Sequence, residues 1–392
     1  MPIGHSLSGA FDQPEVTRYL GRVFSDTATS YKLFWFRALL ETLKRRWASQ
    51  LGQQSQAIPV GTVLSEMVVA AWHPVCLFRL SLGTTDKLQD ICAEVRSLSN
   101  IAPAAPPEEI RTFLTLTPSL EKRLQHLALY VPTLFLTPWF GEEMRGIEGG
   151  NARAKAASKL AFARRTTSQP APYWVDGNRA NSMLQLDPGW EHFLKENLMV
   201  MEAFADHSLS RYLQARNPNT PSIVHKLRAP FNRQLSHARS FWLLVHDVLS
   251  AAGDSASFRD IYAGVNLGKN FSIDHCLPWS YVAHDQLWNL APVLAETNSR
   301  KSDSLPDPEL YLPRLARLHY RALGVLRDKP RFHEDYATCF NQSASSILEK
   351  GEEQLVAAYQ AVFIPHMQIA QNQGFVTGWK FEGRATLNPA RA

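Results

Sequence analysis

The chain has 392 residues, of which 45% are hydrophobic and 20% are charged. This composition is ordinary for a globular protein, so it excludes a largely disordered chain, and the length suggests two or three domains. The formal net charge of +5 at pH 7 is compatible with nucleic acid or another polyanion as a partner, but it is too small to identify one alone.

The four cysteines, Cys76, Cys92, Cys276 and Cys339, are far apart and form no CxxC pair. The sequence therefore indicates neither a disulfide framework nor a cysteine-based zinc site, and we expect reduced thiols. The first residues lack the charged-then-apolar pattern of a signal peptide, and no apolar run approaches the roughly 18 residues of a membrane span. We therefore expect a cytoplasmic protein with no membrane partner.

Hydrophobic periodicity predicts a mostly helical chain over the first 140 residues. Apolar residues recur at three- and four-residue spacing over 30–51, with Ser30 as the N-cap. The stretch from Tyr130 to Leu136 is interrupted by a proline, and it predicts a short strand or extended segment. Three further helices are predicted, over residues 59–73, 84–98 and 108–128.

From residue 141 onward the predicted elements are mixed. Gly149 and Gly150 break the chain before a short Ala-rich helix. Residues 173–186 predict two strands that are joined by a turn at Asp176 and Gly177. Further helices are predicted over 189–215, over 235–252 and through most of the chain after residue 309, with breaks near Pro330 and Gly351.

Two windows of the chain hold most of its positive bias and contain no Asp or Glu. Such basic runs are typical of a track that contacts nucleic-acid phosphates, which makes binding sensitive to salt. The alternatives are a solvated face and pairing with acids elsewhere in the chain. The first window, 149–175, contains Arg153, Lys155, Lys159, Arg164 and Arg165. The second window, 207–246, contains Arg211, Arg216, Lys226, Arg228, Arg233 and Arg239.

The segment from Phe271 to Asp307 carries the residues with the clearest chemistry. Asp274 and His275 end a short apolar run, and Asn289 and Asn298 follow at intervals of fourteen and nine residues. Phosphodiester hydrolysis needs an activated water, which a histidine can supply, and stabilisation of the charge that develops on the phosphate and on the leaving oxygen. One divalent cation can stabilise both charges, and Mg²⁺ prefers a few oxygen ligands while keeping several waters.

This spacing resembles the HNH nuclease superfamily, whose ββα finger binds a metal ion and cuts phosphodiester bonds. The finger is most similar to the HNH domains of RNA-guided CRISPR effectors, which share the pattern D-H-x-x-P-x-S, then N, then x-x-N-x-x-K-S-D-x-x-P. The matching positions are Asp274, His275, Pro278, Ser280, Asn289, Asn298, Lys301, Ser302, Asp303 and Pro306.

The resemblance implies roles for individual residues. Asp274 and Asn298 would be the ligands of a Mg²⁺ or Mn²⁺ ion. His275 would be the general base, and Asn289 would brace the loop that carries it. The third position of the family name is Asn298 here, where many members have histidine, and both residue types occur as ligands in the family.

The resemblance also implies the elements of the finger. Residues 272–273 would end the first strand, and residues 289–294 would form the second. Asn298 would open the helix that follows. Lys301 and Arg300, on the first turns of this helix, would bind substrate phosphates.

Neighbouring side chains have two interpretations each. His284 and Asp285 lie in the loop between the strands, as a surface pair or as a second layer around the site. Cys276 suggests a thiol ligand, but packing is favoured because no second cysteine is near and the site suits a hard metal. Trp279 and Trp288 either support the finger or stack on a base.

Outside the finger, the chain resembles a group of bacterial HNH proteins through S-Y-K-x-x-W-F at residues 30–36 and Y-L-Q-x-R-N-P-N-x-P at residues 212–221. This resemblance implies an association with defence against phage or mobile elements, so we expect a metal-dependent DNA endonuclease. The alternative is a nuclease-bearing subunit of an RNA-guided CRISPR complex, whose N-terminal region binds guide RNA, DNA or partner subunits.

The expected fold class is α+β, a mostly helical protein with a ββα-metal HNH finger in its C-terminal half. Four regions are expected: a helical N-terminal region (1–140), a basic region that binds nucleic acid or a partner (141–240), an HNH nuclease domain (241–325) and a helical C-terminal region (326–392).

Overall fold

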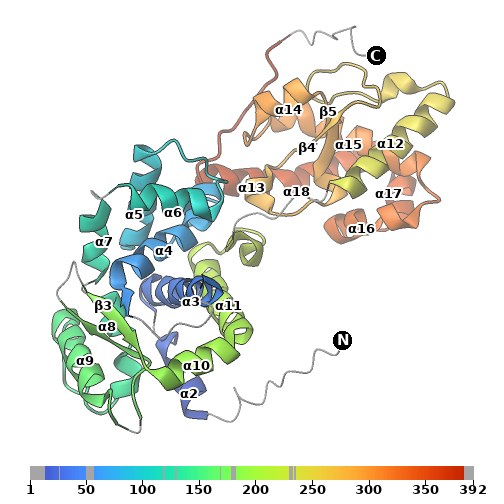
Figure 1. Ribbon diagram of the computed structural model, residues 1–392. Helices are drawn as coiled ribbons and strands as arrows, with labels where there is room; N and C mark the ends of the chain where they lie inside the picture. The colour runs from blue at the N-terminus through green and yellow to red at the C-terminus, as the bar shows by residue number, and fades with distance from the viewer. Residues whose placement is uncertain are drawn as a thin grey trace. The chain divides into compact units, whose positions relative to one another are not determined.

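The computed structural model describes residues 14–25, 27–49, 57–117, 120–128, 130–167, 169–177, 182–228, 233 and 235–383. The fold is α+β and mostly helical, as the sequence predicts (Figure 1). The chain divides into two compact units, which we call the N-terminal unit (Met1–Pro218 with Ile223–Ala229) and the C-terminal unit (Asn219–Ser222 with Pro230–Ala392). The expected regions 1–140 and most of 141–240 therefore share one unit, and 241–325 shares the other with 326–392.

The N-terminal unit consists of helices and one small sheet, in which the antiparallel strands have the order β1-β3-β2. Its elements are α2 (Pro14–Val23), α3 (Tyr31–Ser49), β1 (Ile58–Pro59), α4 (Val60–Trp72), the π-helix η1 (His73–Leu77), α5 (Lys87–Leu98), α6 (Pro107–Thr115), α7 (Glu121–Ala128), α8 (Val131–Leu134), the 3₁₀ helix η3 (Thr137–Phe140), α9 (Gly150–Arg164), β2 (Tyr173–Asp176), β3 (Met183–Leu186), α10 (Pro188–Glu196), α11 (Leu198–Arg216) and the 3₁₀ helix η5 (Ile223–Lys226).

Helix α3 is central to the N-terminal unit and packs against α4 and α11 (Figure 1). Its buried Trp35 donates a hydrogen bond from the indole nitrogen to the hydroxyl of Tyr173, at 2.9 Å. That hydroxyl in turn donates to the backbone carbonyl of Pro132, at 2.6 Å. The two hydrogen bonds satisfy buried polar groups and tie α3 to β2 and α8.

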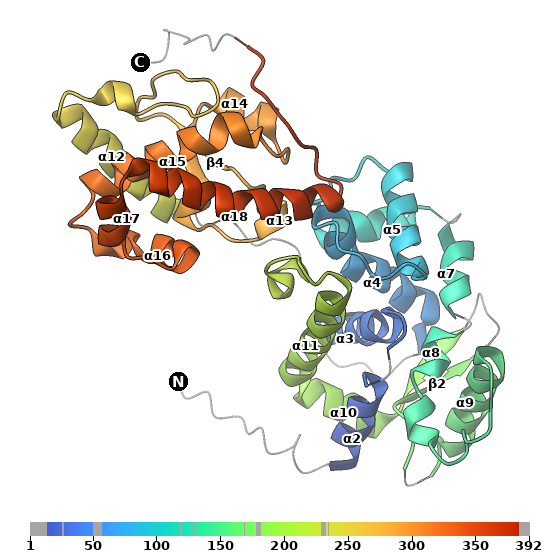
Figure 2. The ribbon, with the colours of Figure 1, turned by 180° about the vertical axis from the view of Figure 1, so that it is seen from behind.

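The C-terminal unit contains one two-stranded sheet among helices, and α18 runs along the unit beside α15 (Figure 2). Its elements are α12 (Ser236–Ala251), the 3₁₀ helix η6 (Ser255–Ser257), β4 (Ser272–His275), α13 (Trp279–Val282), the 3₁₀ helix η7 (Leu287–Asn289), β5 (Leu290–Val293), α14 (Ala295–Lys301), α15 (Pro308–Val325), the 3₁₀ helix η8 (Pro330–Phe332), α16 (Glu334–Phe340), α17 (Ala344–Lys350) and α18 (Glu352–Asn372).

The chain after α18 pairs with the segment that follows α14. The Leu305 amide donates to the Val376 carbonyl at 2.8 Å, and the Trp379 amide donates to the Leu305 carbonyl at 3.0 Å. The indole of Trp379 then packs edge-on against the ring of Tyr262, with ring centroids 5.3 Å apart. The end of the described chain therefore supports the loop that precedes β4.

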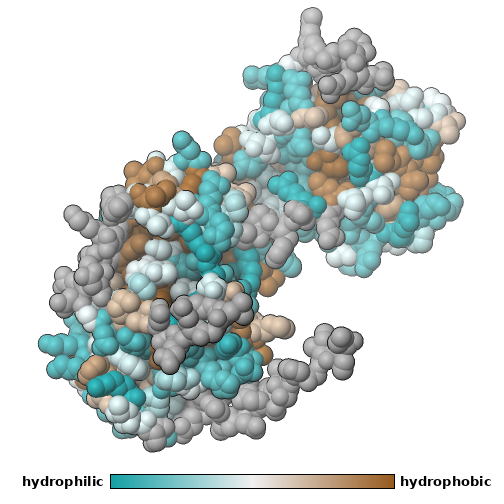
Figure 3. Space-filling model, viewed as in Figure 1, coloured by the Kyte–Doolittle hydropathy of each residue, from teal (hydrophilic) through white to brown (hydrophobic). Residues whose placement is uncertain are grey.

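The surface of each unit mixes hydrophilic and hydrophobic residues, as the face seen in Figure 3 shows. Isolated exposed apolar side chains are normal on soluble domains and need no partner. The large ones among the described residues are Leu98, Leu116, Phe162, Met199, Val224, Val248, Leu310, Ile364 and Val376.

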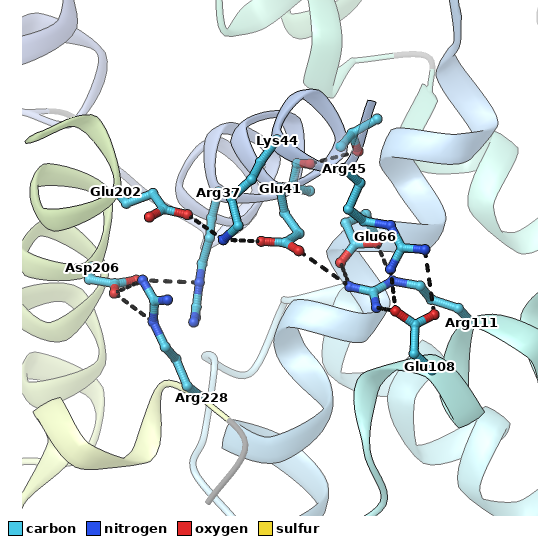
Figure 4. A network of polar contacts seen from close by, with 12 residues as sticks. Arg37, Glu41, Lys44, Arg45, Glu66, Glu108, Arg111, Glu202, Asp206 and Arg228 are labelled. Carbon is cyan, nitrogen blue, oxygen red and sulfur yellow. Dashed lines mark hydrogen bonds and ion pairs between the residues drawn. The ribbon is translucent and has the colours of Figure 1, made fainter. Parts of the chain in front are cut away.

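A network of ion pairs joins α3 to α4, α6 and α11 (Figure 4). Arg111 pairs with Glu66 at 2.7 Å. The carboxylate of Asp206 forms ion pairs with Arg37, at 3.3 Å, and with Arg228. The cations of the network include Arg37, Lys44, Arg45, Arg111 and Arg228, and its carboxylates include Glu41, Glu66, Glu108, Glu202 and Asp206.

Three predicted elements differ from the structure. The stretch 130–136 is not extended but forms α8, in which Pro132 stands in the first turn, where its missing N–H removes no helical hydrogen bond. The helix predicted over 189–215 is two helices that meet at Asn197, whose side-chain amide donates to the last turn of α10. The helix predicted over 108–128 is likewise divided, into α6 and α7.

One segment corrects the expectation about apolar runs. Val60–Leu77, which comprises α4 and η1, is long and apolar enough by length and composition to cross a membrane. In the structure 67% of this segment is buried inside the protein. A buried core helix passes the same test, so the segment is only weak evidence for a membrane span.

His319 is completely buried in the core of the C-terminal unit. Its Nδ1 lies 2.6 Å from the hydroxyl of Tyr336, and the ring of Trp242 packs against it. Burial lowers the pKa of His319 to about 3, because the charged imidazole would lose its hydration. In the unfolded chain the pKa returns to about 6.5. Between these two pKa values, the unfolded state therefore binds one more proton at His319 than the folded state does. The free energy of unfolding decreases as the pH falls below about 6.5.

We expect the free energy of unfolding of the C-terminal unit to fall by up to about 1.4 kcal/mol per pH unit in this window because of His319 alone. His319→Gln cannot titrate and should remove this share of the pH dependence. His237→Gln, at an exposed position of the same unit, should retain it. Urea unfolding at mildly acidic and neutral pH measures the difference, and an unchanged pH dependence in His319→Gln would contradict the assignment.

Candidate active site

Strands β4 and β5 pair in antiparallel fashion and hold Asp274 and His275 at the end of β4. The register places Asp274 opposite Ala291 and His275 opposite Leu290. All four residues of β5 are buried, as its apolar sequence requires. Because successive residues of a strand point to opposite faces, the neighbouring side chains of Asp274 and His275 enter different surroundings.

Asp274 is a buried carboxylate, only 3% exposed. The Tyr262 hydroxyl donates to its Oδ2 at 2.8 Å, and the ammonium of Lys301 lies 3.2 Å from each of its oxygens. Lys301 is itself completely buried, and it also donates to the backbone carbonyl of His275 at 2.7 Å. The buried carboxylate thus has a cation and a neutral donor, which offset the loss of hydration.

Two neighbours of Asp274 stay protonated. Burial and the charge of Asp274 raise the pKa of Tyr262 well above its usual value, so the hydroxyl keeps the proton that it donates. Burial raises the pKa of Cys276 to about 12. A metal ligand would have to be the thiolate, so the structure favours packing over ligation for Cys276.

His275 has its hydrogen-bond partner in the loop between α13 and η7. Its Nε2 lies 2.8 Å from Oδ1 of Asp285. The other ring nitrogen, Nδ1, makes no hydrogen bond with any residue that the structure describes. One nitrogen of His275 is therefore fixed, and the other is left for proton transfer.

Asn289 is completely buried at the end of η7, directly before β5. Its Oδ1 accepts from the Leu277 amide at 2.8 Å, and its Nδ2 donates to the Leu277 carbonyl at 2.9 Å. Its own carbonyl accepts from the Cys276 amide at 2.9 Å. These three hydrogen bonds fix the chain directly after His275, which is the geometry that a brace requires.

Asn298 lies in the middle of α14 rather than at the start, where the sequence analysis placed it. The helix begins earlier because the backbone of Leu294 is extended and its amide is held by the carboxylate of Asp260, at 2.9 Å. From its place in the helix, Asn298 directs its Nδ2 to the carbonyl of Ile273, at 3.4 Å. Its side chain therefore lies beside the residue that precedes Asp274.

The donors available for a metal ion are oxygens. Among the described residues, no group of three or more His, Cys, Asp and Glu side chains could hold a metal. Asp274 and Asn298 instead offer a carboxylate and an amide oxygen, which are ligands that Mg²⁺ takes. An ionised carboxylate has about four lone-pair positions, so the contacts with Tyr262 and Lys301 leave acceptor capacity on Asp274. By the type of donor atom, the two residues therefore suit a hard cation.

Lys301 and Arg300 do not lie where a phosphate contact was expected. Lys301 has no exposed surface and is directed at Asp274. Arg300 is exposed, but it pairs with Glu296 at 2.8 Å and donates to the carbonyl of Glu382 at 3.0 Å. The side chains of neighbouring residues in a helix point about 100° apart. Lys301 therefore lies on the buried side of α14, whereas Arg300 points toward the C-terminal segment.

Several residues of the two basic windows are used inside the N-terminal unit. Lys226 is buried, and burial lowers its pKa to about 7, so it is not placed to contact phosphate. Arg164 and Arg228 pair with carboxylates of their own unit. Arg216 donates to the carbonyl of Ala28 at 3.2 Å. The two basic windows contain no acidic residues, but the fold brings Glu143 and Asp206, which lie outside them, to Arg164 and Arg228.

Helix α9 carries the exposed basic residues of the first window. Lys155 and Lys159 are both exposed and lie one turn apart. Arg165 lies over the exposed ring of Phe162, at 3.7 Å from the centroid. Arg153 is less exposed and donates to a backbone carbonyl in the preceding loop.

Two arginines of the second window lie near β4 in the C-terminal unit. Arg233 is exposed and sits over the ring of Trp279, at 5.1 Å. Arg239 sits over Phe271 at the same distance and donates to its carbonyl at 2.9 Å. The other tryptophan of the finger, Trp288, is buried and therefore supports the finger.

The part of the chain that contains this site matches a known family. Residues 257–307 match a family model described as HNH endonuclease. These residues form an HNH endonuclease domain. Its location in the C-terminal half confirms the prediction, whereas the similarities to CRISPR effectors and to defence proteins stay predictions. No curated protein and no solved structure matches the chain.

Two contacts of the HNH domain were not predicted from the sequence. Tyr262 lies 12 residues before Asp274 and belongs to no motif, so only the fold reveals it. The sequence leaves two interpretations of Asp285 open, a surface residue and a supporting one, because its spacing from His275 is compatible with both. The loop geometry decides the question by placing its carboxylate on the imidazole.

The pairing of Asp274 with Lys301 predicts a strong energetic coupling. Lys301→Met should destabilise the C-terminal unit by about 3–5 kcal/mol, because it leaves a buried carboxylate without its cation. Asp274→Asn in the Lys301→Met background should recover much of this loss, since the neutral amide needs no cation. Urea unfolding of the two single variants and the double variant gives the coupling energy. Additive effects would show that the pair contributes nothing as a pair.

Proposed function

We propose that this protein is an endonuclease that hydrolyses DNA phosphodiester bonds with a divalent cation. The HNH endonuclease domain supports a nuclease that acts on DNA. The observation that carries the proposal is the arrangement at the end of β4. There, Asp274 and His275 are adjacent, and Asn298 reaches the preceding carbonyl from α14.

In this proposal His275 is the general base. Its Nε2 is occupied by Asp285, so Nδ1 takes the proton from the water that attacks the phosphorus. Asp274 and Asn298 would hold Mg²⁺ or Mn²⁺, which neutralises the charge of the transition state and stabilises the leaving oxygen. Asn289 keeps the chain after His275 in place through the hydrogen bonds to Leu277.

Lys301 has a different task from the one that the motif suggests. Its ammonium contacts Asp274 and the carbonyl of His275 at once. We therefore assign it to orienting these two residues rather than to binding phosphate. A buried and fully hydrogen-bonded lysine can hold a ligand carboxylate in one rotamer, as supporting residues of metal sites do.

The surfaces that support DNA contact are fewer than the basic windows suggested. In the N-terminal unit, the exposed face of α9 combines Lys155 and Lys159 with an aromatic ring capped by Arg165. In the C-terminal unit, Arg233 and Arg239 lie on aromatic rings close to β4. Cations of this kind contact phosphates, and the exposed ring of Phe162 can stack on an unpaired base.

We place this activity in the cytoplasm of a prokaryote, in defence against foreign DNA, with the motifs at 30–36 and 212–221 as support. The alternative is a nuclease-bearing subunit of an RNA-guided CRISPR complex, with guide RNA and partner subunits bound by the N-terminal unit. The pairing of Arg164 and Arg228 and the burial of Lys226 support this alternative, because these residues of the basic windows are not available for a nucleic-acid track of that unit.

The purified chain should nick plasmid DNA with Mg²⁺ or Mn²⁺, and a chelator should stop the reaction. His275→Ala should lower the rate about 10²–10⁴-fold, since it removes the general base. His192→Ala, an exposed residue of the N-terminal unit, should cut normally. In the subunit alternative the isolated chain is inactive and gains activity with guide RNA and partners. If His275→Ala cuts like wild type in the active system, the base is another residue.

The α9 surface predicts a salt effect. Lys155→Ala with Lys159→Ala should weaken DNA binding and reduce the slope of log affinity against log salt by about 2, since each phosphate contact contributes about one counterion. Lys87→Ala with Lys195→Ala removes the same charge from other exposed positions of the unit and should leave the slope unchanged. Fluorescence anisotropy over a salt series measures both, and equal slopes would place the DNA elsewhere.

A further inference from the structure

The hydrogen bond between His275 and Asp285 is set up by a well-anchored loop. Two residues after Asp285, the Leu287 amide donates to Oδ2 of Asp335 on α16, at 2.7 Å. The hydroxyl of Tyr359 on α18 donates to the Trp288 carbonyl, at 3.1 Å. The loop is therefore held by contacts that do not involve the carboxylate of Asp285, and it presents that carboxylate to the ring at a fixed position.

We propose that Asp285 is a positioning residue that fixes the tautomer and orientation of His275. Its carboxylate accepts a hydrogen bond from Nε2–H, which leaves the lone pair of the imidazole on Nδ1. This inference rests on the proposed nuclease function for its catalytic meaning, but the contact itself can be tested without activity.

The chemistry follows from the two nitrogens of a neutral imidazole. One nitrogen carries a proton and the other a lone pair, and the partner of the first decides which is which. An ionised carboxylate only accepts hydrogen bonds, so at 2.8 Å Asp285 requires Nε2–H. The base is then confined to Nδ1, the nitrogen that has no partner among the described residues.

The same contact assists the reaction as it proceeds. A water proton moves to Nδ1, the water oxygen forms a bond to phosphorus, and the bond from phosphorus to the leaving oxygen breaks. His275 becomes a cation in this step. The carboxylate of Asp285 already touches the ring and stabilises that charge, as the aspartate does in hydrolase triads. The electron pair of the broken bond goes to the leaving oxygen, which takes a proton from solvent water, and His275 then returns its own extra proton to solvent.

A purely structural role for Asp285 predicts different behaviour. Its side chain is 21% exposed, and the loop has its own anchors in Asp335 and Tyr359. Asp285→Asn has nearly the same size and should leave the unfolding midpoint within a few degrees of wild type. A large effect on His275 without loss of stability would then come from the missing carboxylate.

The first measurement reads the tautomer directly. Nitrogen shifts of ¹⁵N-histidine in the full chain, at a pH that keeps imidazole neutral, show which ring nitrogen carries the proton. His275→Gln identifies the signal by its disappearance. We expect only the Nε2–H form in wild type and a mixture of both forms in Asp285→Asn. The same form in both proteins, or the Nδ1–H form in wild type, would overturn the proposal.

The second measurement separates rate from binding. Asp285→Asn should lower kcat for plasmid nicking by about 100-fold, within the range of general-base effects, with KM changed less than about threefold. Asp285→Glu restores a carboxylate and should recover at least about tenfold of the loss. Asp328→Asn, at an exposed position of the same unit, should act like wild type. A wild-type kcat in Asp285→Asn would sink the proposal.

The two measurements distinguish the two hypotheses. If the tautomer shifts as expected but the protein cuts no nucleic acid under any condition, the proposed function fails while the assignment of the contact holds. If the protein cuts and loses this activity in His275→Ala, but not in Asp285→Asn, the proposed function holds and the role of Asp285 is overturned.

Discussion

The buried carboxylate of Asp274 is the constraint on which the HNH domain depends. An anion at this depth requires a cation and hydrogen-bond donors, and both come from separate segments of the chain. Lys301 supplies the charge from α14, and Tyr262 supplies a hydroxyl from the loop before β4. Trp379 packs on that tyrosine from the C-terminal segment. One polar requirement thus fixes the positions of a helix, a loop and the end of the described chain around β4.

Alternation along β4 separates the two halves of the site. Asp274 faces Tyr262 and Lys301, whereas His275, one residue later, meets Asp285. The proposed metal ligand and the proposed base, which are adjacent in sequence, therefore have separate supporting residues. The ammonium of Lys301 contacts the side chain of Asp274 but only the backbone carbonyl of His275, not its ring.

The sequence predicted those features that depend on local spacing. The strand ending in Asp274 and His275, and the later positions of Asn289 and Asn298, follow from the motif. Lys301 shows the limit of such predictions. It occupies the expected motif position three residues after Asn298, but the direction of its ammonium is determined by the buried carboxylate of Asp274, which needs a cation. The predicted contact of Lys226 with nucleic acid is not supported for a related reason. Lys226 is buried, and burial depends on tertiary packing, which the absence of acids from a stretch of sequence does not reveal. The segment 130–136 became helical because a proline is tolerated in a first turn.

Charge balance also limits how the protein can hold nucleic acid. Several cations of the two basic windows are already paired or buried within the N-terminal unit, namely Arg164, Arg228 and Lys226. Affinity that depends on phosphate contacts must then come from small exposed sets, such as Lys155 and Lys159 on α9. A few contacts give weak, salt-sensitive binding that does not by itself select a sequence. Target choice would therefore have to come from base contacts near β4 or from a guide, and the latter is what the RNA-guided alternative supplies.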